Sequence, residues 1–92
     1  FVFLVWLGET ARQEAIKTAC TLRRAGVECR MEYKERSLRN QMGRASKLGA
    51  AWTIIVGEDE VNRGIFQLKD MASGEQKEVS LDELLSLVHT TD

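Results

Sequence analysis

The chain has 92 residues, of which 43% are hydrophobic and 29% charged; it carries a formal net charge of −1 and contains no proline. This length suits one domain with one core, and no apolar run reaches the roughly 18–20 residues that a membrane-spanning helix needs. The composition excludes collagen-like and disordered chains. The near-zero net charge does not by itself point to a polyanionic partner.

An apolar run opens the chain and precedes an amphipathic helix. Residues 1–7 are continuously apolar and rich in aromatic and β-branched side chains, which predicts a central strand buried on both faces. Thr10 and Gln13 have the spacing of a capping box, so we expect a helix to begin there and to run to about Ala25. Its predicted inner face consists of Ala11, Ala15, Ile16, Ala19 and Leu22, with Gly26 just beyond its end.

A second strand and a second helix follow. Residues 27–31 alternate between apolar and charged side chains, which predicts an edge strand or one with a solvated face. Ser37 is the expected N-cap of a helix that ends at Gly49. Its expected apolar stripe is Leu38, Met42 and Ala45, with Asn40, Arg44 and Lys47 on the opposite side.

Residues 52–56 are apolar throughout and predict a third, central strand, which Gly57 ends. Three carboxylates come next, at Glu58, Asp59 and Glu60. We interpret them as the acidic first turn of a short helix, because a metal site needs converging ligands from a second segment that the chain does not visibly supply.

The last third of the chain predicts a β-hairpin and a helix. Residues 64–71 and a strand ending at Val79 are joined by a turn at residues 73–74. Ser80 and Glu83 form a second capping box. The helix that follows is expected to bury Leu81, Leu84, Leu85 and Val88.

This order of elements predicts the architecture. Strand–helix–strand crossovers need parallel strands and right-handed connections, so we expect a three-layer α/β domain with a mixed five-stranded sheet flanked by helices. If the second and third strands flank the first, a crevice lies at their carboxyl ends, lined by residues 6–10 and 56–60.

Sequence motifs for catalysis are missing. There is no G-x-G-x-x-G, no P-loop and no nucleophile elbow. Cys20 and Cys29 lack the spacing of zinc ligands and fit a reducing cytoplasm, and the single histidine, His89, is expected as a surface residue at a helix end. We therefore expect no catalytic residues, no metal and no cofactor in this domain.

Charge is distributed unevenly along the chain. Residues 12–47 carry ten Lys and Arg against four Glu, which is +6, whereas residues 57–92 carry three basic and nine acidic side chains, which is −6. A basic helix bearing Arg39, Arg44 and Lys47 can track phosphates, although charges that only solvate a helix face give the same pattern. Lys69 is either a solvated strand residue or a donor to a phosphate or base.

Motifs spread over the whole chain resemble one family. These motifs are Leu7-Gly8-Glu9, Arg36-Ser37-Leu38-Arg39-Asn40-Gln41-Met42, Ile54-Ile55-Val56-Gly57-Glu58-Asp59-Glu60, Gly64, Leu68-Lys69-Asp70 and Gly74-Glu75-Gln76. In this order and spacing, they resemble the C-terminal anticodon-binding domain of class IIa aminoacyl-tRNA synthetases. The R-S-L-x-x-Q and I-I-x-G-E-x-E segments are most similar to the histidyl branch.

The resemblance implies a single domain, residues 1–92, excised from a longer, homodimeric cytoplasmic synthetase that ligates histidine to its tRNA. It implies that this domain reads the anticodon, while ATP and Mg²⁺ act in a separate catalytic domain. The family's base-reading positions are held here by Glu35, Arg36, Glu60 and Lys69. Arg39, Arg44 and Lys47 would hold the tRNA backbone without reading sequence.

Two other functions remain open at this point. The same fold occurs in synthetase relatives that no longer charge tRNA and serve as regulatory or protein-interaction modules, and fold alone does not separate these. A small flavodoxin-like enzyme comes third, because the phosphate and nucleophile motifs are missing.

Overall fold

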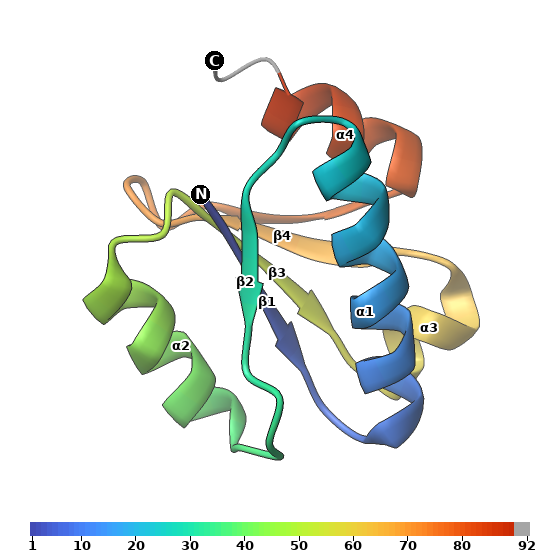
Figure 1. Cartoon of the computed structure of the whole chain (residues 1–92), viewed down its shortest axis with the longest axis vertical. Coiled ribbons are helices and arrows are strands. Elements are labelled where there is room, and N and C mark those ends of the chain that lie inside the picture. Colours follow the sequence, from blue (N-terminus) through green and yellow to red (C-terminus); the bar gives the residue numbers. More distant parts are fainter. Residues whose placement is uncertain (90–92) are drawn as a thin grey trace.

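The computed structural model describes residues 1–89 (Figure 1). Its elements in chain order are β1 (Val2–Trp6), α1 (Glu9–Arg24), β2 (Cys29–Met31), α2 (Leu38–Leu48), β3 (Trp52–Val56), α3 (Glu58–Arg63), β4 (Phe66–Asp70), β5 (Gln76–Val79) and α4 (Leu81–His89). The α/β class, the hairpin and the short acidic helix after the third strand are as the sequence predicts.

The five strands form one mixed sheet in the order β2-β1-β3-β4-β5. β1 lies between β2 and β3 and is parallel to both, whereas β3–β4 and β4–β5 are antiparallel. All five residues of β1 are buried, as expected for a central strand covered on both faces. The edge strand β2 has only three residues, so the strand predicted over residues 27–31 is shorter in the structure.

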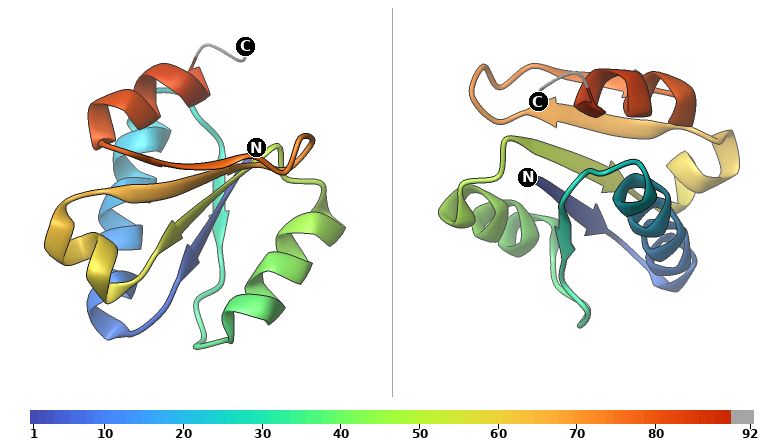
Figure 2. Two further views of the ribbon diagram at one scale, coloured as in Figure 1. Left: turned by 180° about the vertical axis from the view of Figure 1, so that it is seen from behind. Right: turned by 45° about the horizontal axis from the view of Figure 1, so that its top comes forward.

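Helices cover the two faces of the sheet unequally (Figure 2). The larger part of the core lies on the α1 and α4 side and includes Leu4, Leu22, Ile54, Leu68 and Leu84. On the opposite face, α2 packs Ala45 against a smaller cluster with Phe3 and Val5. Because α2 is the only helix on that face among residues 1–89, it leaves part of the sheet uncovered.

The start of α1 differs from the predicted capping box. The N-cap is Gly8, with φ 95°, and no side chain caps the helix, so Thr10 lies inside the first turn. Glycine reaches this left-handed conformation without a Cβ clash, which allows the chain to turn from β1 directly into the helix at Glu9. The capping box at the start of α4 is confirmed, because Ser80 and Glu83 exchange backbone–side-chain hydrogen bonds of 3.2 and 3.3 Å.

Three apolar residues predicted to face inward lie at the surface instead. Ile16, Leu38 and Leu81 are 37%, 43% and 37% exposed. In α1 the buried stripe runs through small side chains, including Thr18, which donates to the Glu14 carbonyl at 2.8 Å. The predicted burial of Val88 and the surface position of His89 fall outside the described side chains. Within residues 1–89, no helix is long and apolar enough to cross a bilayer.

Candidate functional site

The uncovered part of the sheet carries polar side chains on the α2 side of β4 and β5. We call it the open face and define it by Gln67, Lys69, Gln76 and Glu78. Lys69 pairs with Gln76 across the two strands, and Gln67 pairs with Glu78, so all four side chains project from the same face. Gln67 and Lys69 are half-buried, whereas Gln76 and Glu78 are exposed.

Lys69 is a charged residue without a protein partner. It lies on β4 opposite Thr53 of β3, and it makes no hydrogen bond or ion pair with any residue of the described range 1–89. Thr53 is fully buried beneath the same face. The side chain is half-buried and its ammonium group is not engaged by another described residue, so it remains available to a ligand.

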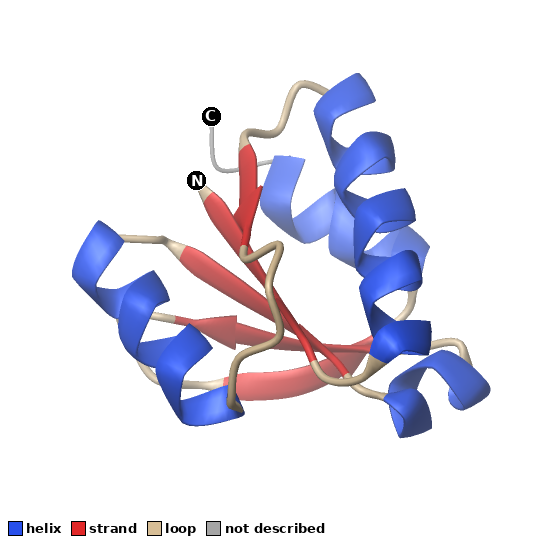
Figure 3. Ribbon diagram, turned by 60° about the horizontal axis from the view of Figure 1, so that its bottom comes forward, coloured by secondary structure: helices blue, strands red, loops and turns tan. Residues whose placement is uncertain are grey.

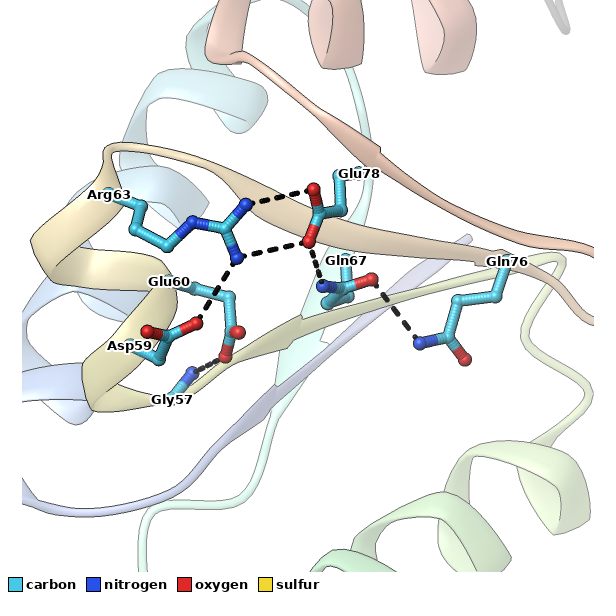
Figure 4. Close-up of polar contacts among 7 residues, drawn as sticks. All are labelled: Gly57, Asp59, Glu60, Arg63, Gln67, Gln76 and Glu78. Atoms are coloured by element: carbon cyan, nitrogen blue, oxygen red, sulfur yellow. Dashed lines mark hydrogen bonds and ion pairs between the residues drawn. The ribbon is translucent and has the colours of Figure 1, made fainter.

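Glu60 lies at the other end of the same strand pair, on α3. Its Oε1 accepts a hydrogen bond of 2.8 Å from the Gly57 backbone N–H, which caps the helix and fixes the carboxylate at the end of β3 (Figure 4). A Cβ at position 57 would lie 2.8 Å from this oxygen, so glycine leaves the room that the carboxylate occupies. Glu60 thus has a structural role, and its second oxygen is free of partners within the described part of the chain.

Lys69 and Glu60 lie at opposite ends of β3 and do not converge on one point. Thr53, the partner of Lys69, and Gly57, which binds Glu60, are four residues apart, or about 13 Å along a strand. These two side chains can therefore contact different groups of one extended ligand, and they cannot grip a single small one.

Glu35 and Arg36 lie in the connection between β2 and α2, which crosses beside the strand ends (Figure 3). With Ser37 they line an open hollow of about 500 Å³ against Leu7 and Gly8, at the carboxyl end of β1. The predicted crevice is therefore present, but its second wall is this connection. Trp6 and Val56, expected to line it, are only 3% and 0% exposed because they belong to the core.

Gln41 anchors this connection to the sheet. It is fully buried on α2; its Oε1 accepts from the Trp6 backbone N–H at 3.0 Å, and its Nε2 donates to the carbonyls of Trp6 (2.7 Å) and Arg36 (2.8 Å). β2 ends at Met31, opposite Leu4, so Gln41 supplies the hydrogen bonds that a longer β2 would have given Trp6. This role of Gln41 is not apparent from the sequence, although Gln41 is the last residue of the R-S-L-x-x-Q segment.

The basic residues of α2 do not form one stripe. Arg44 donates to Glu32 across 2.5 Å, on the flank of the helix that faces β2. Arg39 is five positions earlier, which places it about 140° away around the helix. It shares a flank with Met42, which packs against the smaller core cluster, as Ile55 and Met71 also do. Lys47 is exposed near the end of α2.

The acidic and thiol groups of the described chain form no reactive centre. No group of three or more potential metal ligands occurs within residues 1–89. Cys20 is exposed and Cys29 buried, and both are free thiols. Burial raises the pKa of the Cys29 thiol from 9.0 to about 11, so this group stays protonated at neutral pH.

A second set of polar contacts, on the open face, is also not predicted from the sequence. Arg63 of α3 binds Glu78 of β5 through two hydrogen bonds of 3.0 and 3.1 Å, and it reaches Asp59 at 3.2 Å (Figure 4). These hydrogen bonds, followed by charge attraction, raise the pKa of Arg63. Nothing in the local sequence pairs two residues fifteen positions apart.

Comparison with known proteins identifies the family. A family model described as "Anticodon binding domain" matches residues 2–91. A curated "Histidine--tRNA ligase 2" of Bacillus cereus is 44% identical over 86 residues, which are 94% of this chain and 20% of the relative. The chain thus spans about a fifth of the length of the curated relatives it matches.

Solved structures agree with this match. The apo histidyl-tRNA synthetase of S. aureus superposes with a TM-score of 0.87 at 32% identity, covering 96% of this chain and 23% of that one. The RNA binding domain of a threonyl-tRNA synthetase from Cryptosporidium parvum, with a TM-score of 0.89 at 17% identity over 97% of this chain and 22% of that one, shares the fold. The chain therefore belongs to the anticodon binding domain family, and it is similar to the domains of this family in histidine–tRNA ligases.

Proposed function

We propose that this chain reads the anticodon of a histidine-accepting tRNA as one domain of a histidine–tRNA ligase. Lys69 donates to a base acceptor, Glu60 accepts from a base amino or imino group, and Glu35 and Arg36 contact bases from the connection before α2. Arg39, Arg44 and Lys47 hold the phosphate backbone. The ligase similarity supports the tRNA's identity, and the open face supports the mode of binding.

The observation that carries this proposal is the unpartnered ammonium of Lys69. A lysine ammonium offers three hydrogen-bond donors and no acceptor. No residue among 1–89 accepts a hydrogen bond from Lys69, so the position favours a ligand rich in acceptors. An unpaired RNA base offers carbonyl and ring-nitrogen acceptors, and the backbone offers phosphate oxygens.

The distance between Lys69 and Glu60 suits this ligand. Bases of a single-stranded loop are unstacked and spread apart, so they can reach points separated by about 13 Å along the sheet. We therefore assign the two side chains to different bases. We assign ATP and Mg²⁺ to a separate catalytic domain of a homodimeric, cytoplasmic ligase.

Titration of the chain with a stem-loop RNA carrying the histidine anticodon GUG tests the proposal. Lys69→Ala should weaken this binding by roughly 1–3 kcal/mol, because it removes the donor to a base. The same variant should lose much less for a stem-loop of scrambled anticodon, and the affinities are measured by fluorescence anisotropy at one salt concentration.

Lys77→Ala is the matched control. Lys77 pairs with the buried Leu68, so it projects from the opposite face of the sheet, and its removal should leave anticodon-dependent binding unchanged. Equal losses for both RNAs in Lys69→Ala would reduce Lys69 to a phosphate contact. An absence of any preference for GUG in the wild-type chain would contradict the proposed function and favour a protein-interaction module.

A further inference from the structure

A continuous line of hydrogen bonds crosses the open face (Figure 4). It runs from α3 to β5, then to β4, and returns to β5. It starts at the paired contacts of Arg63 with Glu78. Gln67 Nε2 then donates to Glu78 Oε2 at 3.1 Å, and Gln76 Nε2 donates to Gln67 Oε1 at 3.4 Å. Four side chains from three elements are thus linked, and Gln76 is the last of them.

The chemistry of Glu78 sets the direction of this line. Hydrogen bonds from Arg63 hold the pKa of Glu78 below its ordinary value, so the group is a carboxylate at neutral pH and can only accept. Gln67 must therefore turn its NH₂ group toward Glu78 and its carbonyl toward Gln76. Gln76 in turn donates to that carbonyl, which leaves its own Oε1 without a partner in the described structure.

The free Oε1 of Gln76 belongs to the residue directly opposite Lys69. The two residues are register partners on β5 and β4, so their Cβ atoms lie about 5 Å apart on the same face. The open face therefore presents the amide oxygen of Gln76, an acceptor, beside the ammonium group of Lys69, a donor. A phosphate carries only acceptor oxygens and offers nothing for the Gln76 oxygen to accept, whereas the Watson–Crick edge of a base carries a donor beside an acceptor.

We propose that Gln76 is a base-reading residue of the anticodon site, paired with Lys69 on one base, and that Arg63 and Glu78 are positioning residues that fix its amide through Gln67. This inference rests on the proposed function and extends it to a specificity-determining residue. The ligand is one unpaired base of the anticodon, bound through adjacent donor and acceptor atoms.

Stem-loops in which each anticodon base is replaced singly test this assignment in the full chain. Gln76→Ala should weaken binding of the GUG loop about tenfold and remove most of the discrimination at one anticodon position, the same position that Lys69→Ala affects. Discrimination at the other two positions should persist. Gln76 is exposed, so its truncation leaves the core intact, which thermal unfolding checks.

Glu78→Gln tests the positioning role separately. The amide can both donate and accept, so Gln67 and Gln76 are free to reverse, and discrimination should fall at the same position as in Gln76→Ala. The double variant should show no further loss, because both changes remove one linked contact. Glu75→Gln, at an exposed turn residue without a side-chain partner in the described range, controls for the lost negative charge.

Two results would overturn the inference. If Gln76→Ala keeps full discrimination while Lys69→Ala loses it, the anticodon function stands and the role of Gln76 is wrong. If the wild-type chain discriminates among none of the stem-loops, the proposed function itself fails, and the assignment of Gln76 fails with it.

Discussion

Single residues in this domain show how burial changes ordinary chemistry. Cys29 is 5% exposed on β2, where its thiol lies 3.7 Å from the Val27 carbonyl. Desolvation is the main cause of its raised pKa, and the nearby Arg23 lowers it by a smaller amount. The folded state therefore holds this proton more tightly than the unfolded chain, in which the thiol has its ordinary pKa of 9.0.

This difference predicts an alkaline loss of stability. The contribution of the protonated thiol is complete below about pH 9 and is lost as the pH rises toward the folded pKa of about 11. Between about pH 8 and pH 10.5, the free energy of unfolding should fall by roughly 2 kcal/mol more in the wild type than in Cys29→Ala. Urea unfolding of both proteins at the two pH values measures this fall in the free energy of unfolding. An equal fall in wild type and Cys29→Ala would show that groups other than Cys29 cause it.

Two helix caps whose partners are close in sequence, at Ser37 and Ser80, were predicted correctly, whereas contacts between residues distant in sequence were not. Ser37 accepts from the Asn40 N–H at 3.1 Å, three positions away, and this cap was predicted. Lys69 was a candidate binding residue because of its place on the hairpin. Whether its side chain has a protein partner depends on every segment that packs around it, so this could not be predicted from the local sequence. The roles of Glu78 and Gln76 required the register of β4 and β5, which the sequence does not specify.

At the scale of elements, α2 and its preceding connection form a unit built around one amide. The hydrogen bonds from Gln41 reach Trp6, 35 positions away, and Arg36. Trp6 Nε1 also donates to the Glu32 carbonyl at 2.6 Å, so the connection is fastened at both ends. The intervening residues 33–35 are all exposed, which leaves Glu35 accessible on a fixed support.

Gln41→Met should therefore destabilise the domain although it conserves side-chain volume. It leaves the Trp6 N–H and two carbonyls without partners, which costs about 3 kcal/mol of unfolding free energy. Urea denaturation measures the loss. Gln13→Met, at an exposed position on α1, should change stability by less than about 0.5 kcal/mol. A cost below about 1 kcal/mol for Gln41→Met would show that the amide does not hold the connection.

The element pattern explains two sequence predictions that failed. Thr10 carries a capping-box signal, but the turn at Gly8 starts the helix one residue earlier than the threonine. Ile16 fits the helical period of α1, but the sheet contacts a narrower stripe of small residues, and the larger side chain remains at its margin. In both cases tertiary packing, which a local pattern does not contain, decided the outcome.

For the whole molecule, the uneven charge of the sequence becomes an arrangement around the sheet. The connection before α2 and α2 itself bring Lys34, Arg36, Arg39, Arg44 and Lys47 to one side, while α3 and α4 carry acidic first turns. Glu32 partly neutralises Arg44, whereas Arg39 is exposed and makes no ion pair with another described residue. The near-zero net charge is thus compatible with a local attraction for RNA.

Salt dependence of RNA binding tests this arrangement. If Arg39 contacts a phosphate, Arg39→Ala should reduce the slope of log affinity against log salt by about one unit, through loss of counterion release. Lys17→Ala, an exposed change on α1 across the sheet, should leave the slope unaltered. An unchanged slope in Arg39→Ala would remove Arg39 from the contacts with the RNA backbone.

The two edge strands have a consequence for the domain in concentrated solution. Exposed sheet edges invite strand pairing between copies, which leads to aggregation. Here β2 has three residues with the exposed Arg30 at its centre, and β5 presents Lys77 and Glu78. Short length and charge both oppose such pairing, so these charged side chains help to keep copies of the chain apart.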